Sequence, residues 1–127
     1  MRDIYNNIDV DQAIIPAVYA ATTAGAVVDL LGYNSAALVI NSGAIAGAGL
    51  YVVSLEESDA SGSGFAAVAA GDMQGTLPAS LAADSVVKVG YLGHKRYLKA
   101  TITKTSGTSI AAGAVIVKGN AAKKPVA

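Results

Sequence analysis

Short runs of β-forming residues, separated by turn residues, recur along most of this chain and constrain its fold more than any other feature. From Leu98 to Lys104 apolar and polar residues alternate, which is typical of a strand with one buried and one hydrated face. The spacing of the runs predicts an all-β protein, an antiparallel β-sandwich or barrel, with little helix. The longest helix-compatible piece, 77–84, allows only one or two turns. The runs are 27–31, 37–41, 50–56, 65–69, 85–92, 95–104 and 114–118.

The two ends of the chain differ from its middle. Residues 1–20 are predicted to form an extended N-terminal arm, because Pro16 lacks a backbone donor and biases Ile15 away from the helical region. Residues 21–120 are predicted to form a single β domain, because a chain of 127 residues has the length of one ordinary domain. Residues 121–127 are expected to be a C-terminal tail.

Small and apolar residues dominate the composition. Hydrophobic residues make up 53% of the chain and charged residues only 14%, and much of the hydrophobic fraction is alanine. Small residues suit thin, tightly packed sheets and turns, and they also suit surfaces that neighbouring copies cover. No cysteine is present, which excludes disulfides and thiolate sites. The uncharged stretch 30–55 is long enough to cross a membrane, but polar and glycine residues break it into short runs. We therefore expect a soluble protein that works where it is synthesised, with no membrane partner.

Charges are segregated along the sequence, although the formal net charge is zero. Every acidic residue precedes residue 85, and every basic residue except Arg2 follows residue 87. If the two halves occupied different faces, copies could meet head to tail, or one face could dock on a surface of opposite charge. The alternative is a scatter of solvated charges.

Tyrosines and cations gather in 90–97, around a glycine turn at the start of the alternating strand. Tyrosine and arginine are favoured anchors in buried contacts, so we predict a contact patch for another protein surface. The alternative is a tyrosine pair that packs over the turn while the cations stay in solvent. Nucleic acid is disfavoured, because single-strand binding needs several aromatic residues along a basic groove. The residues of this predicted patch are Tyr91, Lys95, Arg96, Tyr97 and Lys99.

No set of residues has the pattern of a catalytic, metal or phosphate site. His94 is the only histidine, and it adjoins two cations without an identifiable carboxylate or serine partner. The acidic loop 56–64 offers oxygen ligands, but an EF-type calcium loop that starts at Asp59 requires glutamate where Ala70 stands. The glycine-rich segment 43–49 is not followed by the Lys-Ser/Thr of a phosphate-binding loop. We therefore expect neither enzyme activity nor a cofactor.

Five segments, in order along the chain, resemble a family of small head-associated structural proteins of tailed bacteriophages. They are 2–7 (Arg-Asp-Ile-Tyr-Asn-Asn), 29–36 (Asp-Leu-Leu-Gly-Tyr-Asn-Ser-Ala), 56–59 (Glu-Glu-Ser-Asp), 65–68 (Phe-Ala-Ala-Val) and 90–97 (Gly-Tyr-Leu-Gly-His-Lys-Arg-Tyr). The resemblance spans most of the chain, which makes it more specific than any single motif. It supplies no catalytic residues.

The resemblance implies a virion structural protein, and capsid decoration is the role we prefer. The expected partners are the major capsid protein and further copies of the chain, most simply as a trimer, on the exterior of a head assembled in the bacterial cytoplasm. The start of the arm, Arg2, Asp3, Ile4 and Tyr5, is expected to strap onto a neighbour. A head–tail connector or tail protein, and a glycan-binding β-sandwich module, are the alternatives.

Overall fold

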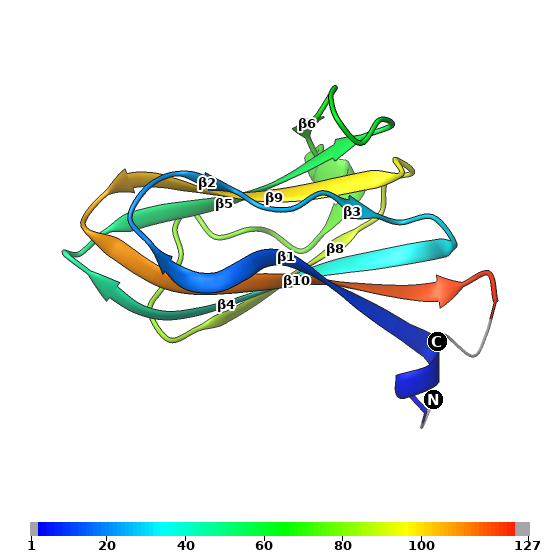
Figure 1. Cartoon of the computed structure of the whole chain (residues 1–127), viewed down its shortest axis with the longest axis horizontal. Helices are drawn as coiled ribbons and strands as arrows, with labels where there is room; N and C mark the ends of the chain where they lie inside the picture. The colour runs from blue at the N-terminus through cyan, green and yellow to red at the C-terminus, as the bar shows by residue number, and fades with distance from the viewer. Residues whose placement is uncertain (1–2, 124–127) are drawn as a thin grey trace.

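Two antiparallel β-sheets pack face to face in the structure, a computed structural model that describes residues 3–123 (Figure 1). Sheet A has the strand order β1-β10-β4-β8-β7, and sheet B has the order β2-β9-β5-β6, with β3 also paired to β9. The predicted antiparallel sandwich is confirmed, and the sheets do not close into a barrel. The strands are β1 (Ile8–Tyr19), β2 (Thr23–Ala24), β3 (Val28–Asp29), β4 (Tyr33–Ala46), β5 (Leu50–Ser58), β6 (Ala66–Ala67), β7 (Met73–Gln74), β8 (Val86–Tyr91), β9 (Tyr97–Ser106) and β10 (Ser109–Ala121).

The core lies between the sheets and follows the alternation of the long strands. In β9, Leu98, Ala100 and Ile102 are buried, and the residues between them face outward. In β4, Leu38 and Ile40 are buried in the same way from the opposite layer. Side chains of successive strand residues point to opposite faces, so buried and outward residues alternate along these strands.

Residues 8–19, predicted as part of a free arm, form β1 and belong to the sandwich. β1 pairs with β10 from Ile8 opposite Gly119 to Tyr19 opposite Ile110. Ala13 and Ile14 are in the core, at 0% and 2% exposure. Proline does not interrupt the sheet, because β1 is an edge strand with register shifts on either side of Ile14, and a missing donor is tolerated there.

Two further expectations are corrected by the structure. Residues 77–84 contain no helical turn; the segment is a loop that buries Leu81, whose amide donates to the Tyr51 carbonyl at 2.7 Å. The tail expected from residue 121 begins later, because β10 extends to Ala121 and the Ala122 amide donates to the Gly32 carbonyl. Residues 124–127 lie outside the described residues. Within 3–123, no helix has the length and hydropathy that a membrane-spanning helix needs.

Candidate interaction surfaces

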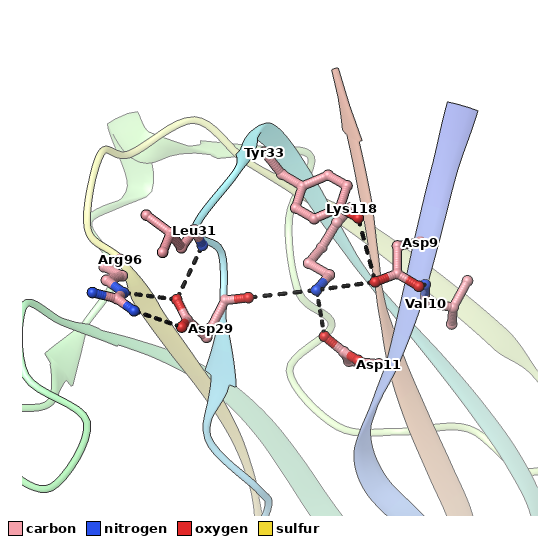
Figure 2. Close-up of polar contacts among 8 residues, drawn as sticks. All are labelled: Asp9, Val10, Asp11, Asp29, Leu31, Tyr33, Arg96 and Lys118. Atoms are coloured by element: carbon pink, nitrogen blue, oxygen red, sulfur yellow. Dashed lines mark hydrogen bonds and ion pairs between the residues drawn. The ribbon is translucent and has the colours of Figure 1, made fainter. Parts of the chain in front are cut away.

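The two predicted contact regions lie at the same end of the sandwich. Residues 3–7 precede β1, and the loop 92–96 leads into β9, at the end where β4 begins (Figure 1). A line of contacts joins β1 to the second region: Lys118 bridges β1 to Asp29, and Asp29 binds Arg96 (Figure 2). The sequence predicted each region separately, and the fold brings both to this one end.

The cations of the predicted patch are paired within the chain. Lys95 Nζ lies 2.7 Å from Asp59 Oδ2, and the Arg96 guanidinium binds both oxygens of Asp29, each at 2.8 Å. Lys99 Nζ lies 4.5 Å above the ring of Phe65. Bidentate arginine–carboxylate pairs are stronger and geometrically more specific than hydrogen bonds between uncharged groups. The surface at this end is therefore held in place by ion pairs and is not a bare positive patch.

The two tyrosines of the patch follow the packing alternative. Tyr91 is 5% exposed; its hydroxyl donates to Glu57 at 3.3 Å and accepts from the Lys95 amide at 3.0 Å. Burial raises the pKa of Tyr91 to about 12. The ring of Tyr97 lies 5.0 Å below the Arg96 guanidinium. Tyr91 is thus a core side chain that supports the loop, and its expected role as a direct surface contact is corrected.

Lys118, a buried lysine that sequence reasoning missed, links β1 of sheet A to β3 of sheet B at this end of the sandwich. Lys118 Nζ lies 2.6 Å from Asp11 Oδ2 and 3.3 Å from Asp9 Oδ2, and 4.7 Å from the Tyr33 ring centroid (Figure 2). Its side chain is 8% exposed. Desolvation opposes its charge, but hydrogen bonds and charge attraction from Asp11 and Asp9 outweigh that effect and raise the pKa of Lys118. We call Lys118, Asp9, Asp11 and Tyr33 the Lys118 cluster.

Acidic and basic halves of the sequence are recombined by these contacts. Each ion pair found among the described residues joins an acid before residue 85 to a base after residue 87. The paired strands come from opposite ends of the chain, so the charges of the two halves meet within one molecule. At these positions the two halves of the sequence therefore share one surface and do not form separate faces of opposite charge.

Exposed apolar side chains surround this end of the sandwich. Ile4 is 54% exposed and Tyr5, in the short 3-10 turn Tyr5–Asn7, is 86% exposed. Leu31, before β4, is 68% exposed, and Leu92, after β8, is 57% exposed. We call these four residues the apolar rim. Arg2, the remaining residue of the predicted strap, lies outside the described residues.

Asp3 fixes the start of the chain. Its carboxylate accepts from the Asn6 amide nitrogen at 3.1 Å and from the Asn6 side chain at 2.8 Å. These hydrogen bonds lower the pKa of Asp3. These local hydrogen bonds hold Asp3 against the 3-10 turn that carries Tyr5, so the Asp3 carboxylate is occupied within the chain.

Stability in acid is expected to depend on Asp29. The hydrogen bond from Arg96 lowers the pKa of Asp29 from 3.8 to about 2. A carboxyl whose pKa is depressed by folding stabilises the fold above its unfolded pKa, and this contribution is lost as the pH falls through the folded pKa. Between about pH 4 and pH 2, wild-type urea midpoints should fall more steeply than those of Asp29→Asn. If the urea midpoints of the wild type and of Asp29→Asn fall in parallel over this pH range, the Arg96–Asp29 pair does not influence stability in acid.

His94 is exposed on the loop before β9. Across residues 3–123, no three of the metal-binding side chains His, Cys, Asp and Glu converge on one point. No protein-family model matches the chain, and no curated protein matches its sequence.

Proposed function

We propose that this chain is a structural protein of a tailed-bacteriophage virion, a decoration protein that binds the outer head surface at junctions between major capsid subunits. The observation that carries the proposal is the end described above, at which both predicted contact regions lie and the apolar rim is exposed. The ordered resemblance of the sequence to phage head-associated proteins supports the same role. An exposed apolar rim of this kind is suited to binding another protein surface.

Stabilisation of a shell requires that each copy binds in a fixed orientation. The Lys118 cluster and the Arg96–Asp29 pair tie β1, β3, β9 and β10 together directly behind the rim. Because these side chains are ordered before binding, less conformational entropy is lost when the rim docks. Many copies on a lattice then convert modest individual contacts into a large total resistance to expansion.

The rim is expected to be necessary for binding. In the double variant Ile4→Ala/Tyr5→Ala, affinity for heads assembled without the protein should fall by at least about tenfold, because large apolar anchors dominate such contacts. Copies bound per head can be counted after co-sedimentation with heads of the phage that encodes the chain. Both side chains are exposed, so thermal stability should not change.

Leu50→Ala is the matched control, because Leu50 is 48% exposed at the opposite end of the sandwich. It should bind heads like the wild type. Equal binding by the double variant and the wild type would exclude the rim as the contact. A wild-type protein that does not bind heads would refute the decoration role itself.

A further inference from the structure

The outer face of sheet A is apolar although no part of the chain from residue 3 to residue 123 forms a layer over it. Apart from Asn41 and Lys88, outward positions on the central parts of β4, β8 and β10 carry aliphatic side chains or none, and β1 adds further aliphatic residues at the edge. Lys88 is the charged residue on the outward side of β8. The outward residues are Val10, Gln12, Pro16, Val18, Ala37, Val39, Asn41, Val86, Lys88, Ala111, Gly113, Val115 and Val117.

Sheet B shows the contrast expected of a face in water. The outward residues at the centre of β9 are Lys99, Thr101 and Thr103, and opposite them on β5 stand Glu56, Ser54 and one aliphatic residue, Val52. The Thr101 hydroxyl donates to Glu56 at 3.0 Å. An antiparallel sandwich normally presents polar residues on both outer faces. A face as apolar as that of sheet A therefore indicates a surface that is covered when the protein functions.

This apolar face has a hollow and a ridge that fit each other. A hollow of about 750 Å³ lies over β10, with Ala111 and Gly113 at its floor. Val86, on β8 at the far side of β4, is 67% exposed and lines the same hollow; we call this projecting side chain the ridge. Pairing places Gly113 opposite Asn41 and Asn41 opposite Val86, so floor and ridge lie in one row across the sheet.

We propose that this face binds the same face of a second copy, about a two-fold axis that runs along β4. A half-turn about that axis places β8 of one copy over β10 of the other. Each row of paired residues keeps its position along the strand direction, so equivalent rows face each other. Val86 of each copy then enters the hollow above Gly113 of the other, and the two Val39 side chains meet on the axis. Lys88 lies over Val115, and its stem can extend toward Gln12 and solvent.

The area of the face agrees with a reversible pair. Strands about 4.8 Å apart and residues about 3.4 Å apart give a face of roughly 500 Å² in each copy. Two copies bury roughly 1,000 Å² together, which is the lower limit for specific interfaces. The zero net charge of the chain adds no long-range repulsion between copies. We therefore expect a two-fold dimer that dissociates on dilution, in place of the trimer expected from the sequence.

Sedimentation velocity of the purified protein, without heads, tests this proposal independently of the decoration role. The wild type should approach twice the 12.6 kDa chain mass as its concentration rises. Val39→Glu places a charge on the axis and should weaken self-association by at least about tenfold, because two buried like charges would face each other. Thr103→Glu, on the outer face of sheet B, is the matched control and should dimerise like the wild type.

Cross-linking provides a second test that does not depend on how Val39→Glu folds. The chain has no cysteine, so Val39→Cys introduces a single thiol. A short bis-maleimide should link Val39→Cys into dimers and leave Thr103→Cys monomeric. The proposal is overturned by a wild type that stays monomeric at high concentration, by a three-fold species, or by a dimer that Val39→Glu leaves intact. It is also overturned if Val39→Glu impairs only head binding, because the shell would then be the occupant of this face.

Discussion

Gly25→Ala is expected to destabilise the protein by at least about 3 kcal/mol, because the added methyl group would overlap backbone atoms of both sheets. A Cβ at position 25 would lie 2.2 Å from the Ala13 carbonyl oxygen and 2.6 Å from the Ala100 carbonyl oxygen. Both obstacles are backbone atoms of different sheets, so neither can move without breaking strand pairing. Gly25 lies between β2 and β3, where the chain has just entered sheet B and still contacts β1 of sheet A.

The same position also carries hydrogen bonds that a shift would break. The Gly25 amide donates to the Ala100 carbonyl at 2.7 Å, and the next amide, of Ala26, donates to the Ala13 carbonyl at 2.9 Å. Urea unfolding of Gly25→Ala measures the loss. Gly62→Ala is the control, since nothing lies within 4 Å of a Cβ there, and it should change stability by less than about 0.5 kcal/mol. A Gly25→Ala variant as stable as that control would show that the two sheets separate easily at this point.

Lys118→Met should lower the free energy of unfolding by about 2 kcal/mol at neutral pH. Methionine fills a similar volume beside Tyr33, so the loss isolates the charge and its hydrogen bonds. Without the lysine, Asp9 and Asp11 repel each other on one face of β1. Their side chains are 39% and 43% exposed, and water screens part of this repulsion, which keeps the expected loss below that of a fully buried pair.

A double-mutant cycle separates the ion pair from packing. Adding Asp11→Asn to Lys118→Met should recover part of the lost stability, because the amide removes one of the two unpaired charges. The coupling between positions 11 and 118 is expected to exceed about 0.5 kcal/mol. Additive effects of the two substitutions would mean that Lys118 contributes only through its stem.

Strand content was predictable from the sequence because it depends on local patterns. The alternation in β9 and the turns around it are encoded by adjacent residues, and the observed strand runs from Tyr97 to Ser106. β1 was missed as a strand because Pro16 and the acids Asp9 and Asp11 resemble an exposed segment. Only the pairing with β10 shows that these acids face a buried lysine and that the proline occupies a sheet edge.

The predicted site residues show the same division between local and long-range information. The sequence identified 90–97 as unusual, but the acids that pair with its cations lie far away along the chain, at Asp29 and Asp59. Pairing over such separations depends on strand order, which residue patterns do not specify. Exposure of Ile4 and Tyr5 also depends on where β1 begins. The apolar face of sheet A was predictable only in part, since small apolar strand residues suit a core equally well.

Electron cryo-microscopy of heads assembled without this chain, before and after addition of the purified protein, tests the central claim most directly. Added density should cover the outer surface at the junctions between capsid subunits, with the end that carries Ile4 and Tyr5 against the shell. Heads that show no new density, or density confined to the tail vertex, would contradict a decoration role.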